Sequence, residues 1–377
     1  MPTRAAIFRA RARLGVKPLA QLFARACVPL ATADTPGAFY RGRRLVSIDG
    51  TCLDMADTPV NDAEFGRPGS GRGEGVGAFP QVRLVALAEC GTHAITAVAM
   101  GPYATGEATL ARSLLGALGP GMLCLADRGF TAHPLLSAAA ATGAELLWRA
   151  KNNAVLPVLE RFDDGSYRSE IVATTDKRAR EHVLAVRVVE YTVDDPGRPQ
   201  ADDSRYRLLT TILDPVDASA DELAALYAER WEIETALDEL KTHQRGPRAV
   251  LRSKTPDGVR QEVYGHLSTH YAIRALMHTA ADDRGVDPDR VSFTRSLRAA
   301  RRSVRSGFGA ATAHLAVALA DAVTEICREL LPARRLRAAA RVVKRKMSNY
   351  GVKRSAHRSW PRPTLPPIDA TRVLAPP

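Results

Sequence analysis

Three acidic residues in this sequence are placed where they could hold metal ions. Asp49 follows the apolar run RRLVSI and precedes a glycine, and Asp127 follows a second such run, MLCLA. Glu234 lies in the charged stretch YAERWEIETALDELK. Carboxylate oxygens suit hard divalent cations, and two such cations can clamp the phosphate of an in-line displacement. The combination predicts nuclease or strand-transfer chemistry, although one acid before a turn is usually structural because Asp favours turns.

The stretch around Glu234 carries four polar residues with the spacing Y-x2-R-x3-E-x6-K. On a helix that rotates about 100° per residue, all four side chains fall within about 60° of one another. The four are Tyr227, Arg230, Glu234 and Lys241. Glu229, Glu232 and Glu239 point away from this stripe, so Glu234 is the acid with the required placement. The alternative is a solvated helix with an ordinary ion pair, because the Arg and Glu of the motif are four positions apart.

Apolar periodicity indicates the elements that would position these acids. Strands are expected at 43–51, 82–90, 93–103, MLCLA and AELLWRA, and helices at 106–118, HPLLSAAAATG and 218–245. Asp49 should end its strand, with Gly50 opening a turn. Alternating residues in 151–216 predict antiparallel strands. The chain beyond residue 245 is expected to be mostly helical.

Composition narrows the class of partner. The chain has 377 residues and a formal net charge of +12, which predicts a polyanionic partner. An apolar run long enough to span a membrane is missing from the sequence, so a membrane protein is not expected. The five cysteines are spread out without a C-x-x-C pair, which argues against a disulfide framework and against zinc sites.

The two aspartates and the complete Y-x2-R-x3-E-x6-K motif resemble the bacterial DDE transposases of the insertion-sequence-4 kind. The resemblance spans roughly residues 40–355 and includes ADRGF, the alternating region and the basic ending RVVKRKMSNYGVKR. It implies an α/β fold with an RNase H-like mixed sheet and flanking helices. A β-rich insertion is expected to interrupt this fold, and a helical basic C-terminal region to follow it.

The resemblance also implies the roles of the site residues. Asp49, Asp127 and Glu234 would be the catalytic triad that binds Mg²⁺, for which Mn²⁺ can substitute. Tyr227, Arg230 and Lys241 would contact DNA phosphates near the cut. A metal-activated water would attack the phosphodiester at the element's end, and the freed 3′-hydroxyl would attack target DNA. The implied partners are terminal inverted repeats, target DNA and a second copy of the chain in the DNA complex, in the bacterial cytoplasm at the nucleoid.

The same resemblance predicts a division of the chain. Its expected parts are an N-terminal helical remnant (1–42), the catalytic core in two parts (43–150 and 217–285), the β-rich insertion (151–216) and the basic C-terminal region (286–377). About 48 residues precede Asp49. That is short for the helical region with which family members bind terminal repeats, so this region is expected to be reduced. A non-catalytic DNA-binding relic or regulator, and a plain RNase H-like nuclease, are the alternatives.

Neighbouring residues have structural interpretations. Asp54 and Asp57 follow the first acid in a turn and loop, where acids are usually solvated. Trp231 is expected to pack in the core, whereas Arg128 could contact DNA or pair with an acid. Trp148 and Trp360 have no role that the sequence can assign. His243 and His266 are expected to be structural.

Basic residues concentrate near the C-terminus. Between Ala333 and Pro367 there are eleven Lys or Arg residues and no acid, as expected of a DNA-binding segment. A second set shares one helix face and would be either a DNA contact or a solvated surface: Arg295, Arg298, Arg302 and Arg305.

The C-terminal segment generates the first prediction. Replacing Arg341, Lys344, Arg345 and Lys346 with Ala should weaken DNA binding nearly equally for all sequences, because phosphate contacts give affinity without base readout. Each lost contact should reduce the slope of log affinity against log salt by about 0.9, measured in a salt titration with duplex DNA. Turnover at saturating DNA should persist. Unchanged affinity and slope would contradict a DNA-binding role for the segment.

Overall fold

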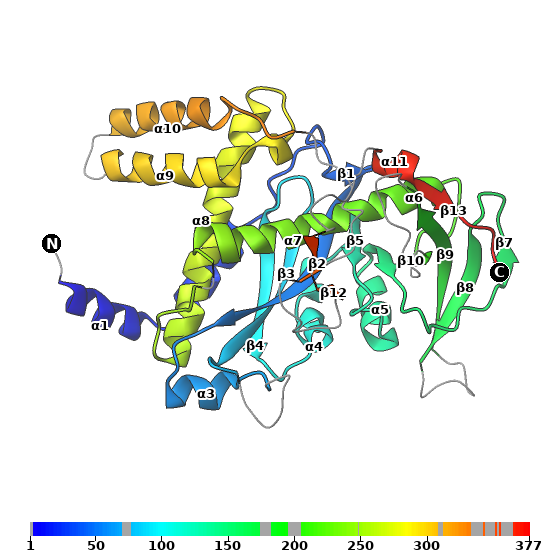
Figure 1. The fold of residues 1–377 in the computed structure, drawn as a ribbon, viewed down its shortest axis with the longest axis horizontal. Helices are drawn as coiled ribbons and strands as arrows, with labels where there is room; N and C mark the ends of the chain where they lie inside the picture. Colours follow the sequence, from blue (N-terminus) through cyan, green and yellow to red (C-terminus); the bar gives the residue numbers. More distant parts are fainter. Residues whose placement is uncertain are drawn as a thin grey trace. The chain divides into compact units, whose positions relative to one another are not determined.

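The computed structural model describes most of the chain, and the chain divides into two compact units (Figure 1). The described residues are 3–69, 77–173, 182–194, 205–247, 249–307, 312–332, 342–343, 351–352, 354–355 and 365–377. The first unit comprises Met1–Ala117 and Trp231–Ala333, and the second Leu118–Arg230 and Arg334–Pro377. The four basic residues of the first prediction, and Trp360, lie outside the described residues.

The first unit is built on an antiparallel sheet. Its strands are β1 (Phe39–Tyr40), β2 (Arg43–Asp54), β3 (Gln81–Glu89) and β4 (Ile95–Pro102), with β3 between β2 and β4 and with β1 paired to β2. Its helices are α1 (Arg4–Leu14), α2 (Lys17–Ala26), α3 (Pro59–Phe65), α4 (Glu107–Arg112), η1 (Leu115–Ala117), α7 (Trp231–Asp238), η3 (Glu239–Gln244), α8 (Pro256–Asp282), η4 (Pro288–Arg290), α9 (Phe293–Gly307) and α10 (Thr312–Ile326). The sheet gives α7 a flat apolar surface to pack on.

The core of the first unit joins the helix α7 to this sheet. Ile233 and Leu237 of α7 are buried in one cluster with Leu53 of β2 and with Leu84 and Ala86 of β3. A second cluster joins the C-terminal part of α8 to α9 and α10, which lie side by side (Figure 1). Burying a Leu or Ile side chain stabilises a fold by about 1.5–3 kcal/mol relative to exposure. The buried Ile233 and Leu237 therefore fix α7 on the sheet.

The position of Asp49 differs from the prediction. The strand β2 does not end at Asp49 but runs on to Asp54, and Asp49 pairs with Ala86 in its middle. Gly50 therefore opens no turn. A Cβ atom at Gly50 would lie 2.5 Å from the carboxyl carbon of Glu107, so the glycine makes room for that side chain. A glycine inside a strand commonly marks such a close approach.

The second unit contains both parallel and antiparallel strand pairs. Its strands are β5 (Met122–Ala126), β6 (Glu145–Arg149), β7 (Glu160–Arg161), β8 (Tyr167–Val172), β9 (Val183–Val193), β10 (Arg205–Thr210), β11 (Val342–Val343), β12 (Gly351–Val352) and β13 (Thr371–Val373). The strands β5 and β6 are parallel, and β10, β9, β8 and β7 follow β6 with antiparallel pairing. The helical segments are α5 (His133–Ala140), α6 (Ala220–Leu226), η2 (Tyr227–Arg230) and α11 (Pro367–Ala370).

Mixed strand pairing with flanking helices makes this an α/β protein, in agreement with an RNase H-like fold. The described strands within 151–216 all pair antiparallel. That this interval is an insertion, and the division of the chain into the five predicted parts, stay predictions. Within the described residues, none of the helices is both long and apolar enough to cross a membrane.

The single regular helix predicted over 218–245 is wrong in detail. Four segments follow one another: α6, the 3₁₀ turn η2, α7 and the π-helical η3. A 3₁₀ turn winds more tightly than an α-helix and a π turn more widely, so the uniform rotation behind the predicted stripe does not hold. The π-helical segment η3 carries two buried polar side chains with long-range partners. Glu239 lies 3.1 Å from both His270 and Arg274, and Gln244 donates to the His266 carbonyl.

The basic face predicted on α9 is partly neutralised. Arg295 forms an ion pair with Glu329, and Arg302 forms one with Glu325 of α10. Arg298 is exposed. Surface ion pairs contribute about 0–1 kcal/mol each, so these pairs orient the arginines more than they stabilise the fold.

The close approach of Glu107 to Gly50 generates a prediction. Gly50→Ala should lower the free energy of unfolding by at most about 1 kcal/mol, because the new methyl group displaces only the end of the flexible Glu107 side chain. In a Glu107→Ala background the same change should be neutral or stabilising, since glycine inside a strand is unfavourable. Chemical denaturation of the two single variants and the double variant measures the coupling. Equal costs of Gly50→Ala in both backgrounds would contradict this account.

Candidate active site

Asp49 lies on the sheet face that α7 covers. Side chains alternate along a strand, so Asp49 shares a face of β2 with Leu53, and its cross-strand partner Ala86 belongs to the cluster that packs on α7. The Asp49 side chain is half-buried, and its Oδ1 accepts a hydrogen bond from the Gly50 N–H at 2.8 Å. This bond fixes one oxygen of a carboxylate beside an apolar core.

Lys241 reaches the same strand. Its Nζ donates to Thr51 Oγ1 at 2.8 Å, and Thr51 is two residues along β2 from Asp49 on the same face. An ammonium group has three N–H donors. This bond therefore fixes the position of the Lys241 charge while leaving it further donors for an anionic oxygen.

Glu234 belongs to α7 and follows the buried Ile233. Its side chain is half-buried, and α7 contacts both β2 and β3. Asp49, Glu234 and Lys241 therefore come from elements that share one face of the first unit's sheet.

Asp127 belongs to the second unit and follows the last residue of β5, as predicted. Its Oδ1 accepts the Gly129 N–H at 2.7 Å, an Asx turn in which the side chain holds the backbone two residues on. A Cβ at Gly129 would lie 2.9 Å from that oxygen. The sequence Asp-Arg-Gly thus places an oriented carboxylate on a tight turn. Arg128 between them is exposed.

Tyr227 lies behind Asp127 within the second unit. Its ring is buried, and its hydroxyl donates to the carbonyl of Ala126, the residue before Asp127, at 3.1 Å. Burial raises the pKa of Tyr227 above its usual range, although Arg230 and Arg149 act in the opposite direction. A phosphate oxygen only accepts hydrogen bonds, so the predicted phosphate contact would require this hydroxyl to leave Ala126.

Two arginines accompany this part of the site. Arg230 is buried, with its guanidinium carbon 6.0 Å from the centre of the Tyr227 ring. Arg149 lies at the end of β6, with its guanidinium 4.3 Å from the centre of the Tyr206 ring. Sequence reasoning missed Arg149. The signal was a basic residue ending the strand AELLWRA, which follows the strand of Asp127.

The predicted residues thus gather in two groups. Asp49, Glu234 and Lys241 belong to the first unit, and the other three, Asp127, Tyr227 and Arg230, belong to the second. Convergence of the three carboxylates stays a prediction. Half-buried carboxylates with one oxygen fixed by a backbone N–H suit a hard cation, which takes oxygen ligands.

Comparison with known families decides the class. The sequence model described as "Transposase DDE domain" matches residues 40–271, which is more than half of the chain. The chain belongs to this family of DDE transposases. All six predicted site residues lie within the matched segment. The resemblance drawn from the motif is confirmed, and members of the family are metal-dependent enzymes that cut and join DNA.

Two relatives from Escherichia coli strain K12 extend this comparison. The chain is 29% identical to the transposase InsG for insertion sequence element IS4 over 366 residues, which cover 96% of this chain and 78% of InsG. It is also 29% identical to the putative transposase InsZ over 151 residues, which cover 38% of this chain and 48% of InsZ. The similarity to InsG thus extends on both sides of the matched domain.

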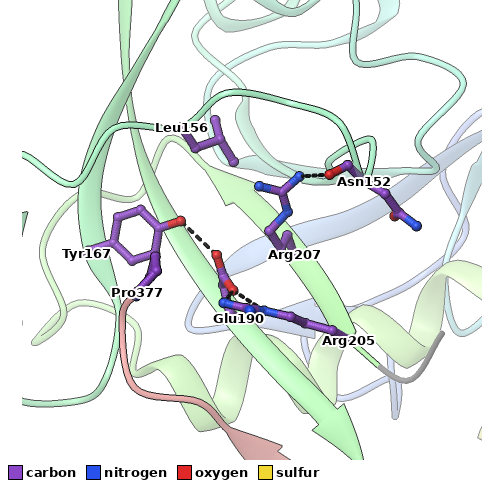
Figure 2. A pocket seen from close by; sticks show the side chains of 7 residues that line it. All are labelled: Asn152, Leu156, Tyr167, Glu190, Arg205, Arg207 and Pro377. Carbon is purple, nitrogen blue, oxygen red and sulfur yellow. Dashed lines mark hydrogen bonds and ion pairs between the residues drawn. The ribbon is translucent and has the colours of Figure 1, made fainter. Parts of the chain in front are cut away.

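The transposase also has a pocket in its second unit, apart from the six site residues. Figure 2 shows this pocket of about 370 Å³, lined by Asn152, Leu156, Tyr167, Glu190, Arg205, Arg207 and Pro377. Its polar groups bind one another: Tyr167 donates to Glu190 at 2.8 Å, and Arg205 forms an ion pair with Glu190. Arg207 donates to the Asn152 carbonyl at 2.6 Å. These contacts indicate a structural network.

The Tyr227 hydrogen bond generates a prediction. Tyr227→Phe should destabilise the transposase by about 1–3 kcal/mol, because the buried Ala126 carbonyl loses its donor. Cleavage at saturating DNA should fall because the turn of Asp127 loosens, whereas DNA affinity should stay unchanged. Single-turnover cleavage and binding titrations measure the two effects. The control is Tyr264→Phe, a tyrosine of the other unit that packs on Phe23.

One result would contradict this positioning role of Tyr227. If Tyr227→Phe weakens DNA binding while the salt dependence stays the same, the neutral hydroxyl contacts a phosphate in the complex.

Proposed function

We propose that this transposase cuts and joins the ends of an insertion element through the carboxylates of Asp49, Asp127 and Glu234. The observation that carries the proposal is the complete Y-x2-R-x3-E-x6-K motif inside the segment that matches the DDE domain. Two further observations support it. Asp49 and Asp127 each have one oxygen held by a backbone N–H, and α7 brings Glu234 to the sheet face of Asp49.

The triad would hold divalent metal ions, with Mg²⁺ as the proposed ion and Mn²⁺ as a substitute. Bound metal supplies a nucleophilic water at neutral pH and neutralises charge that develops on the phosphate. The chain's own contribution is orientation: the Gly50 and Gly129 N–H groups fix the two aspartates before substrate arrives. Groups fixed in advance do not have to reorganise during the reaction.

The three other motif residues have different proposed tasks. Lys241, anchored on Thr51, offers a point charge to a DNA phosphate beside Asp49. Arg230 offers a planar guanidinium that can bind a phosphate with two N–H groups. Tyr227 positions the turn of Asp127 through Ala126. Arg149, near Tyr227, is proposed as a further cation for the DNA backbone.

The proposed partners are the terminal inverted repeats of an element and its target DNA. Two copies of the chain would act in the DNA complex, and the proposed location is the bacterial cytoplasm, at the nucleoid. The net charge of +12 supports a polyanionic partner.

Cleavage of element ends tests the proposal. The inverted repeats that flank the gene would serve as substrate, and cleavage would be measured with Mg²⁺ at saturating protein. Asp49→Asn, Asp127→Asn and Glu234→Gln should each lower the rate about 100-fold or more, because a group that stabilises transition-state charge is worth about 10²–10³ in rate. Asp54→Asn is the matched control, since its Oδ1 accepts a structural bond from Gln81.

DNA affinity without divalent metal should stay the same in all four variants. Full cleavage by any one of the three triad variants would remove that residue from the active site. Absence of cleavage by the unaltered protein on its own element ends would favour a non-catalytic DNA-binding role.

A further inference from the structure

A second set of metal-ligating side chains is buried inside the first unit and includes none of the triad residues. His93 lies between β3 and β4, Glu232 on α7 and Asp289 on η4. One ligand atom from each lies within 4.8 Å of the other two. His93 and Glu232 are almost fully buried, at 3% and 2% exposed. The β3–β4 connection, α7 and η4 therefore bring one nitrogen and two carboxylates together in a largely buried cluster.

Two of the three distances between the ligand atoms match a coordination shell. His93 Nε2 lies 3.0 Å from Asp289 Oδ1 and 3.4 Å from Glu232 Oε2. Around a tetrahedral ion with bonds of about 2.0–2.1 Å, neighbouring ligand atoms are about 3.3–3.4 Å apart, and around an octahedral ion about 3.0 Å. Both distances are therefore compatible with a cation bound to His93 and either carboxylate, and the third pair of ligand atoms also lies within 4.8 Å.

The His93 ring has the buried, unsatisfied nitrogens expected of a ligand. Neither Nδ1 nor Nε2 makes a hydrogen bond of acceptable direction in the structure, although Nε2 is close to two carboxylates. The His93 backbone is left-handed, with φ of 56°, an uncommon conformation for a residue other than glycine. Such strain is held by its surroundings and clusters at functional sites.

The neighbouring groups form a shell around these three. The Gly91 N–H donates to Glu232 Oε2, and His93 Nδ1 faces Glu239 Oε1 at 3.7 Å. Glu239 itself is paired with Arg274 at 3.1 Å. This carboxylate is too far away for a hydrogen bond to Nδ1, but it lies on the side of the ring where metal-bound histidines usually have a carboxylate.

We propose that His93, Glu232 and Asp289 bind one structural transition-metal dication of the zinc class. A mixed nitrogen and carboxylate set suits Zn²⁺, whereas Mg²⁺ prefers oxygen ligands alone. A neutral imidazole, two carboxylates and a dication sum to zero charge, which suits burial because buried charges need compensation. The ion would tie the β3–β4 connection and η4 to α7, the helix that carries Glu234.

A protonated His93 is the competing arrangement. Burial lowers the pKa of His93, but Asp289 and Glu232 outweigh that effect and raise it well above its ordinary value. Burial and the nearby Asp289 also raise the pKa of Glu232. Without an ion, the group would be a buried imidazolium between two carboxyl groups, and the raised pKa of Glu232 favours a proton on that carboxyl.

Metal content separates the two arrangements. The full chain, carrying Asp49→Asn and Asp127→Asn so that the triad retains no ion, would be purified without chelator, offered Zn²⁺ and analysed for zinc per chain. We expect about one zinc per chain and a rise in melting temperature of several degrees, because a ligand that binds only the folded state stabilises it. Cobalt substitution should give the visible absorption of a four-coordinate site.

Variants locate the ion. Asp289→Asn and His93→Gln should each weaken zinc binding at least about tenfold, because loss of even an outer partner costs about 10- to 100-fold in metal affinity. His243→Gln is the matched control, since His243 is half-exposed and lies 3.4 Å from Asp238. Lack of zinc and an unchanged melting temperature in the parent protein would overturn the proposal, whatever the variants do. Zinc retained at full affinity by Asp289→Asn would overturn it as well.

Discussion

The apolar contact between α7 and the sheet of the first unit is the constraint on which the site depends. Ile233 and Leu237 are buried against β2 and β3, and this contact determines where Glu234 can lie. One further turn along, η3 places Lys241 on Thr51. Because large-to-small changes in such a core cost about 2–5 kcal/mol, the helix has little freedom to shift. The positions of the proposed site residues in this unit therefore depend on its hydrophobic packing.

The same helical segment also carries polar side chains into the interior. Glu232 and Glu239 are buried on the side away from the motif and pair with histidines of the β3–β4 connection and α8. Burying carboxylates is unfavourable unless each has a partner. The π-helical geometry of η3 coincides with the long-range contacts of Glu239 and Gln244.

Sequence patterns predicted part of this structure for physical reasons. Apolar runs located the strands β2, β3 and β5, because burial leaves a direct trace in composition. The turn at Gly50 was wrong because Asp-Gly has the same composition whether glycine bends the chain or, as here, makes room for Glu107. His93 went unrecognised, since its partners are 139 and 196 positions away and follow only from tertiary structure. The motif itself was visible because its residues share one segment.

The Tyr227 hydrogen bond explains why a sequence motif can show one partner of an interaction and not the other. The acceptor is the main-chain carbonyl of Ala126, and every residue type at position 126 would supply the same oxygen. Sequence drift in β5 therefore cannot remove this acceptor, and the requirement falls on the tyrosine alone. The Gly50 and Gly129 donors are backbone groups too. Side chains whose partners are backbone atoms are expected to stay constant during divergence while the residues that hold them vary.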